Sequence, residues 1–155
     1  MAKSWTEDDM LVDAITGNLF EALPLLPKRL VRVDAITRTF AMPFSHVQIL
    51  CMLSAGPMTI GEISRSLGIA KPNITPLLDN LAERNLLARV RSTKDRRIVN
   101  VELLPDGVQM AQDIRKAIAG QVLEWPDSID ANGAKKLNNA LACLINTGNL
   151  LSGKK

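Results

Sequence analysis

The chain has 155 residues, of which 46% are hydrophobic, 23% charged and 3% aromatic, and its formal net charge is +3. This length and composition suit one globular domain with an aliphatic core, which excludes an intrinsically disordered chain and favours helices over a β-sandwich. No apolar run approaches the ~20 residues of a membrane span, and the N-terminus lacks a signal-peptide core, so we expect a cytoplasmic protein with no membrane partner.

Residues suited to catalysis or metal binding are sparse. His46 is the only histidine, and no Cys/His cluster has the spacing of metal ligands. Cys51 and Cys143 lie far apart in apolar helical patterns, where we expect buried, unreactive thiols. The sequence therefore predicts neither an enzyme nor a bound metal or cofactor, since no base, nucleophile or ligand set is placed.

The N-terminal part of the chain has a helical pattern. Apolar residues recur at three- and four-residue steps through residues 7–40, although Pro24 and Pro27 must kink or divide this segment because each removes an amide donor. Ser45 is a favourable N-cap residue and predicts the start of the next helix, which should end at the Gly-Pro pair at 56–57.

Two short helices follow. Thr59 and Glu62 have the spacing of a capping box at the start of the first, and Gly68 is placed to stop it. Only residues 68–70 separate this helix from the next apolar pattern. Two short helices joined by a tight turn that contains glycine predict a helix-turn-helix, although many helical hairpins share the pattern.

The second of these helices has prolines near its start. Pro72 costs nothing at a first helical position. Pro76 deletes one interior hydrogen bond if Lys71 is the cap, and is tolerated in the first turn if Asn73 caps instead. The free amides of this polar helix end suit phosphate, and Asn73 and Thr75 have the reach to meet base edges in a DNA groove. The alternative is that these two side chains only cap the helix.

A β-hairpin comes next. Alternating residues predict strands at 87–91 and 98–103, and Asn85 occupies the left-handed position that follows the helix. Residues 84–97 are strongly basic, with one acid, Asp95, among six bases: Arg84, Arg89, Arg91, Lys94, Arg96 and Arg97. A basic hairpin directly after a helix-turn-helix predicts a winged helix with an anionic partner, although a charge run alone is often only a solvated surface.

The tip of the hairpin places Asp95 two residues before Arg97, so both side chains project to the same side of an extended chain. We expect the carboxylate to hold the guanidinium, and an arginine held in this way suits the narrow minor groove of DNA. The alternative is an ordinary surface ion pair. Arg96 points the other way and is expected to meet a phosphate or solvent.

The C-terminal part reads as two further helices. Pro105 opens the first and Pro126 ends it. The second should begin near Asp127 or Asp130 and run to about Leu151. These helices and the N-terminal one carry broader apolar stripes than a small winged-helix core can cover, so we expect a dimer to bury them.

The stretch LGIAKPNITPLLDNLAERNLLARVRSTKDRRIVNVELLPDG resembles the MarR family of bacterial transcription regulators in its two short helices, its D-R-R wing motif and the step into the next helix. The resemblance implies a homodimer whose terminal helices interleave. It also implies a repressor that binds a pseudo-palindromic operator in double-stranded DNA and is released by a small-molecule effector or by thiol oxidation. By position, Lys71, Asn73 and Thr75 would face the major groove. Arg97, held by Asp95, would enter the minor groove.

The chain departs from the family pattern at several positions. Pro76 replaces a polar or basic residue, which removes one candidate DNA contact. Asn85 stands where glycine is usual, and Leu104 stands where a threonine often caps the next helix. The oxidation-sensing branch has a cysteine near the N-terminus, whereas the first cysteine here is Cys51, so peroxide sensing is not expected.

The sequence as a whole predicts a mainly α fold with a small β-hairpin wing. We expect an N-terminal dimerisation region at 1–44, a winged helix-turn-helix DNA-binding domain at 45–104 and C-terminal dimerisation helices at 105–155. The residues predicted to bind DNA are Lys71, Pro72, Asn73, Thr75, Arg91, Lys94, Asp95, Arg96 and Arg97.

An effector pocket is expected between the first two helices and the fifth, with Phe44 and His46 at its edge. A lone histidine in such a place is more often a structural hydrogen-bonding residue than a ligand contact. The alternative function is a winged helix that binds another protein and no operator. A steep loss of DNA affinity with added salt would separate the two functions.

Overall fold

The computed structural model describes residues 9–22, 25–93, 95, 97–125 and 129–151. Its elements in chain order are α1 (Asp9–Ala22), the π-helical turn η1 (Leu26–Leu30), α2 (Val33–Thr39), α3 (Phe44–Leu53), β1 (Met58–Thr59), α4 (Ile60–Leu67), α5 (Lys71–Glu83), β2 (Leu87–Arg91), β3 (Val99–Leu103), α6 (Pro105–Leu123) and α7 (Ala131–Leu151). The predicted mainly α fold with a hairpin wing is confirmed.

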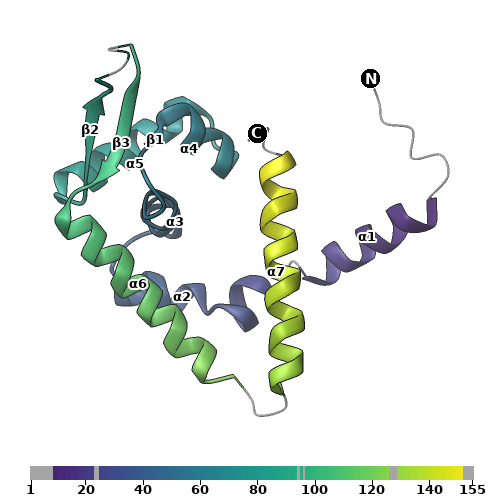
Figure 1. The fold of residues 1–155 in the computed structure, drawn as a ribbon. Helices are drawn as coiled ribbons and strands as arrows, with labels where there is room; N and C mark the ends of the chain where they lie inside the picture. The colour runs from purple at the N-terminus through teal and green to yellow at the C-terminus, as the bar shows by residue number, and fades with distance from the viewer. Residues whose placement is uncertain (1–8, 23–24, 94, 96, 126–128, 152–155) are drawn as a thin grey trace.

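Helix α3 lies at the centre of the core. It runs between α4, α5 and the sheet on one side and α2 and α6 on the other (Figure 1). Ile49 and Leu50 of α3 are fully buried, and so are side chains from each layer around it. These surrounding side chains are Ile63, Ile74, Leu78, Leu81, Leu87, Val101 and Ile114. The core is aliphatic, as the composition predicts.

The sheet has three antiparallel strands in the order β1-β3-β2. The hairpin register pairs Leu87 with Leu103 and Arg91 with Val99. Strand β1 was not predicted. It has only two residues and pairs Met58 with Val101, so its strand character comes from its neighbour β3 and not from a local sequence pattern.

Several predicted helix ends are confirmed. The Thr59 hydroxyl accepts a hydrogen bond from the Glu62 amide, and the Glu62 carboxylate accepts one from the Thr59 amide. Gly68 ends α4 with a φ of 65°, and Asn85 follows α5 with a φ of 59°, both in the left-handed region.

Two predicted helix starts are wrong. Helix α3 begins at Phe44 with Pro43 as its N-cap, so Ser45 is already inside the helix. Proline fixes φ near the value that an N-cap needs, and the Pro43 carbonyl accepts the His46 and Val47 amides. Helix α5 has Ala70 as its N-cap, and neither Lys71 nor Asn73 caps it.

The N-terminal segment is divided, as its prolines predict. Pro27 lies at the start of η1, and the Leu30 and Val31 amides make the i→i+5 bonds of a π-helical turn. Pro24 lies outside the described residues. The segment that follows η1 is tied to the end of α6, because Gln121 accepts a hydrogen bond from the Arg32 amide at 2.7 Å.

Helices α1 and α7 extend away from the winged-helix part (Figure 1). Helix α7 begins at Ala131, next to Asp130, one of the two predicted starts. The Asp130 carboxylate caps it by accepting a hydrogen bond from the Gly133 amide at 2.6 Å. Pro126 and Asp127 lie outside the described residues. Both helices carry exposed apolar side chains, which are Val12, Ile15, Leu19, Phe20, Leu144, Ile145, Leu150 and Leu151. No described helix is long and apolar enough to cross a membrane.

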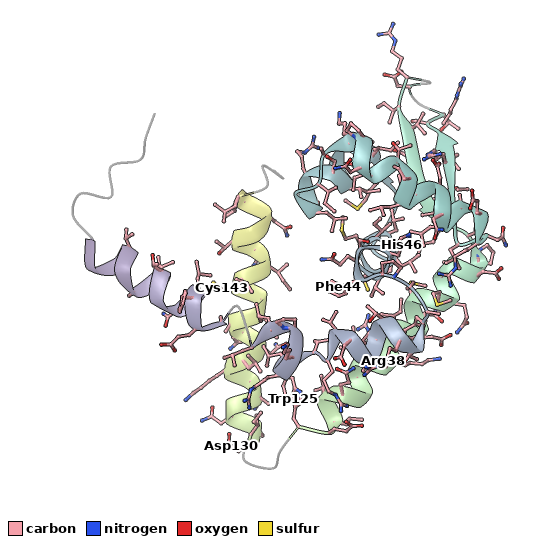
Figure 2. All side chains as sticks on the ribbon, turned by 180° about the vertical axis from the view of Figure 1, so that it is seen from behind. Arg38, Phe44, His46, Trp125, Asp130 and Cys143 are labelled. Carbon is pink, nitrogen blue, oxygen red and sulfur yellow. The ribbon has the colours of Figure 1, made fainter. Side chains whose placement is uncertain are left out.

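The predicted burial of the two thiols is wrong. Cys51 on α3 and Cys143 on α7 are both exposed. Figure 2 shows Cys143 on α7. The apolar pattern around each was read as a buried face, but no described part of this chain covers those positions. Partial burial still raises the pKa of the Cys51 thiol.

Gly107 in α6 tests how closely α6 packs against the residues that lead into the wing. The residue is buried, and a Cβ added to it would overlap the Leu86 carbonyl oxygen at the start of the wing. We expect Gly107→Ala to lower the free energy of unfolding by about 3 kcal/mol or more, because the backbone at Leu86 or Gly107 must move to make room for the added methyl group. Gly120→Ala is the matched control in the same helix, since nothing lies within 4 Å of the added Cβ.

Urea unfolding at one protein concentration measures both variants. The control should be stabilised by roughly 0.5–1 kcal/mol, as expected for replacing a helical glycine. Equal effects of the two substitutions would contradict the close approach of α6 to the wing.

Candidate nucleic-acid interface

The burial of one face of α5 turns its polar end outward. Ile74, Leu78 and Leu81 are fully buried against the core, while Lys71 to Asn73 and Thr75 are exposed. This spacing is that of a single helix face, so the polar residues between the buried ones cannot turn inward without exposing them. The N-terminal end of α5 therefore presents side chains and free amides to solvent.

Pro76 of α5 lies inside the helix, which is one of the two predicted alternatives, although Ala70 and not Lys71 is the cap. Pro72 is the second helical residue, where a missing amide costs nothing. Pro76 lies inside the helix and leaves the Pro72 carbonyl without its i+4 amide partner. Thr75 does not cap, and its hydroxyl makes a long hydrogen bond of 3.4 Å to the Lys71 carbonyl.

Asn73 and Lys71 differ in their surroundings. The Asn73 side chain is exposed and makes no hydrogen bond with any described residue, so its amide is available to a partner. Lys71 instead extends over α4, where a Cβ added to Gly61 would lie 3.6 Å from the Lys71 ammonium. The missing side chain at Gly61 leaves room for the lysine stem.

An ion pair that the sequence analysis missed joins the wing to α5. Arg89 of β2 lies 2.7 Å from the Asp79 carboxylate of α5. Alternate residues of a strand share one face, so Arg91 projects from the same face of the sheet as Arg89. The only sequence signal was an acid on the polar side of α5 and a base in the next strand.

The tip of the wing corrects the expected role of Asp95. Its carboxylate accepts a hydrogen bond from the Arg97 backbone amide at 2.9 Å, and no ion pair joins it to the Arg97 guanidinium. The Ile98 amide bonds to the Asp95 carbonyl at 2.9 Å and closes the turn. Asp95 therefore shapes the turn, and the exposed guanidinium of Arg97 has no partner among the described residues.

Lys94 and Arg96 lie outside the described residues, so their predicted contacts stay predictions. Of the described basic residues in the wing, Arg91 and Arg97 are exposed and unpaired within the described chain. The interface thus consists of the exposed end of α5 and a wing with at least two unpaired cations beside it.

Comparison with known proteins identifies this part of the chain. Residues 45–99 match the model of the MarR family. They form a MarR-family domain. Among curated proteins, the HTH-type transcriptional regulator YsmB of Bacillus subtilis is 35% identical over 72 residues, which are 46% of this chain and 49% of YsmB. The repressor MdtR of the same organism is 30% identical over 73 residues, 45% of this chain and 47% of MdtR. The chain spans about half the length of the curated relatives it matches.

Solved structures extend the likeness beyond residues 45–99. MarR of E. coli without ligand is 18% identical, with a TM-score of 0.66 over 83% of this chain and 95% of that one. A mutant of MepR from S. aureus is 18% identical, with a TM-score of 0.68 over 85% of this chain and 96% of that one. At this identity the match establishes the fold, which is that of winged-helix MarR regulators.

His46 does not lie where the sequence analysis placed it. The MarR-family domain buries its imidazole between α3 and α5, near Asn80 and Arg84, and neither ring nitrogen has a hydrogen-bond partner of good geometry among the described residues. Burial, and next the charge of Arg84, lower the pKa of His46, while Asn80 raises it slightly. His46 is therefore a core residue under α5 and not the edge of a pocket.

Phe44 does line a pocket. A cavity of about 510 Å³ lies between η1, α2, α3 and α6, with Phe44 and Val47 of α3 on one side and Val122 of α6 on the other. Trp125 and Leu141 complete its wall, and none of the described residues that line it is charged. Among the described residues, no group of three or more His, Cys, Asp or Glu side chains could hold a metal ion.

The lowered pKa of His46 predicts acid sensitivity. Because the unfolded chain takes up a proton near pH 6.5 and the folded chain does so only at lower pH, His46 favours folding above about pH 6.5. That contribution is lost as the pH falls through the lowered pKa. We expect the free energy of unfolding to fall between pH 7.5 and 5.5, and to fall less in His46→Leu. Urea unfolding at the two pH values measures this, and equal pH dependence in both proteins would contradict it.

Proposed function

We propose that the chain is a transcriptional regulator that binds a pseudo-palindromic operator as a homodimer. The observation that carries this proposal is the pairing of an exposed polar end of α5 with an unpaired arginine-bearing wing on one MarR-family domain. Free helix amides and cations beside them suit a duplex with regularly spaced phosphates. Among the structural neighbours, MepR of S. aureus is known in complex with DNA.

In this proposal the end of α5 enters the major groove. Asn73 reads base edges, Thr75 and Lys71 lie beside it, and Pro72 stiffens the approach. Asn73 has the fewest ties to the rest of the protein, so it is the strongest candidate for base recognition. Lys71, which extends over α4, is better placed for a phosphate than for a base.

The wing then meets the adjacent minor groove. Arg97 enters it, while Arg91, Lys94 and Arg96 contact the phosphates on either side. Asp95 acts through the turn. Its carboxylate accepts a hydrogen bond from the Arg97 backbone amide and so fixes the backbone position from which the Arg97 side chain extends. This replaces the direct carboxylate–guanidinium contact that the sequence suggested.

Dimerisation follows from the exposed helices. The apolar side chains of α1 and α7 face away from the core of their own chain, and a second copy would bury them. Segments 1–44 and 105–155 then form the dimerisation module, and 45–104 forms the DNA-binding part. Two copies related by a two-fold axis present two α5 ends to half-sites about one helical turn apart.

Effector release is the regulatory part of the proposal. The apolar cavity beside Phe44 connects the dimerisation helices to α3, so a ligand there changes how the DNA-binding part sits on the module. The neighbour NadR, 19% identical with a TM-score of 0.67, is known in complex with 4-hydroxyphenylacetate. Together with the relative named as the repressor MdtR, this supports a ligand-released repressor.

Arg97→Ala tests the wing. We expect the affinity for an operator selected from random duplexes to fall about 5- to 150-fold, because the loss of one arginine contact in a groove costs roughly 1–3 kcal/mol. The slope of log affinity against log salt should also fall by about one. Fluorescence anisotropy at 50 and 200 mM salt measures both, and sedimentation should show an unchanged dimer.

The matched control is Arg38→Ala. Arg38 pairs with Asp34 within α2 at 2.8 Å, away from α5 and the wing, so its loss should leave DNA binding unchanged. If wild-type protein binds no duplex with steep salt dependence, the winged helix is a protein-interaction module instead. If only Arg97→Ala has no effect, the wing takes no part in binding.

A further inference from the structure

Two cavities adjoin along the seam between α3 and α6. The first, of about 600 Å³, lies at the C-terminal end of α3 and the start of α6. The second is the apolar cavity of about 510 Å³ beside Phe44. Cys51 of α3 and Ile118 of α6 line both cavities, so the two cavities meet at these residues, and we treat them as one trough.

The helix faces that line the trough are continuous. On α6 the lining positions run from Val108 through Arg115 and Ile118 to Val122, at three- and four-residue steps that keep them on one face. At 1.5 Å per residue, the part of this face from Arg115 to Val122 is about 10 Å long. Such a length suits an extended aliphatic chain.

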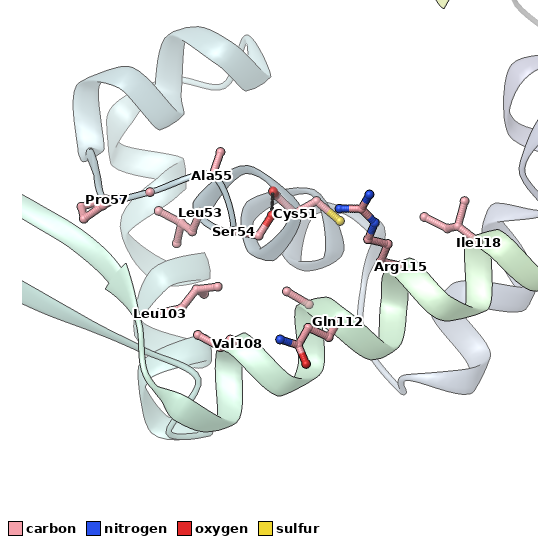
Figure 3. Close-up of a pocket in the computed structure, with 12 residues that line it drawn as sticks. Cys51, Leu53, Ser54, Ala55, Pro57, Leu103, Val108, Gln112, Arg115 and Ile118 are labelled. Atoms are coloured by element: carbon pink, nitrogen blue, oxygen red, sulfur yellow. Dashed lines mark hydrogen bonds between the residues drawn. The ribbon is translucent and has the colours of Figure 1, made fainter. Parts of the chain in front are cut away.

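The two cavities differ in charge. The cavity beside Phe44 has no charged side chain among its described lining residues, whereas the other cavity has Arg115 and Gln112 among aliphatic side chains. Arg115 points from α6 toward Cys51 (Figure 3). It has no carboxylate within 4.0 Å among the described residues, while the adjacent Lys116 is paired with Asp113.

We propose that the trough binds an amphipathic carboxylate with a long aliphatic chain. The carboxylate pairs with the Arg115 guanidinium, whose planar fork suits two parallel hydrogen bonds. The aliphatic tail of the ligand passes Cys51 and Ile118 and ends in the apolar cavity, where it needs no hydrogen bond. Burial of this tail supplies affinity, and Arg115 selects the anion over a neutral or cationic head group.

The regulatory consequence rests on the proposed function. The trough lies along the seam where α3, at the centre of the DNA-binding part, packs on α6, which leads to the dimerisation helix α7. In this proposal, a ligand bound along the seam changes how the two helices pack on each other. Decanoate should therefore weaken operator binding by wild-type protein, and 1-decanol should do so less.

Binding is tested first without DNA. Trp125 lines the apolar end, and a Trp5→Phe background makes it the sole tryptophan. Titration of its fluorescence with decanoate, 1-decanol and decylamine, below micelle formation, should show the tightest binding for decanoate. From octanoate to decanoate, affinity should rise about fourfold for each added methylene.

Arg115→Gln tests the head-group site. It should weaken decanoate at least about tenfold and leave 1-decanol unchanged, since only the charged contact is lost. The control Lys116→Gln, one residue away but paired with Asp113, should change neither ligand. Equal affinity for all three head groups, or an unchanged decanoate affinity in Arg115→Gln, would overturn the proposed recognition.

Thiol labelling locates the ligand. In a Cys143→Ser background, decanoate should slow maleimide labelling of Cys51 several-fold, because the chain passes that thiol. In Cys51→Ser, labelling of Cys143 should not respond. If decanoate does not slow the labelling of Cys51, the proposed location of the ligand is wrong. Labelling of Cys51 that instead depends on protein concentration would mean that a second copy covers the trough, which also overturns the proposal.

The two proposals fail separately. If decanoate binds and protects Cys51 but the protein binds no operator, only the DNA-binding function falls. If operator binding is intact and decanoate does not bind, this inference falls. If both bind and decanoate leaves operator affinity unchanged, the ligand site stands and its regulatory consequence is wrong.

Discussion

The burial of one face of α5 against the core is the constraint on which the proposed interface depends. Ile74, Leu78 and Leu81 are each completely shielded from solvent, and each such burial contributes roughly 1.5–3 kcal/mol. A rotation of α5 that hid its polar end would expose these three side chains. The hydrophobic effect therefore sets the direction in which Asn73 points, although Asn73 itself contributes nothing to that burial.

The wing depends on the same core through different contacts. Leu87 is buried at its base, and the ion pair between Asp79 and Arg89 joins its first strand to α5. Because that pair is partly solvent-exposed, it positions the wing more than it stabilises the fold. The close approach of α6 at Gly107 completes the attachment. The wing and α5 thus form one body, whereas α1 and α7 extend from it.

Local signals made much of this fold predictable. The capping box at Thr59, the left-handed Asn85 and the alternating strands each act within a few residues, so the sequence alone reveals them. Contacts between distant segments were not visible. Strand β1 exists only beside β3, and His46 is buried because α5 covers it. The Asp95 carboxylate had two possible partners at the same spacing, and the backbone amide of the turn is the nearer one.

A hydroxyl-radical footprint on a selected operator tests the central claim most directly, because it shows where both α5 ends and both wings lie on one duplex. The two exposed α5 ends of a two-fold symmetric dimer should protect two equivalent stretches of the DNA duplex. These stretches should be related by symmetry and centred about one helical turn apart. The flanking minor grooves should be protected by the wings. A single asymmetric tract, or symmetric tracts that persist with a monomer, would contradict the arrangement of α5 and wing described above.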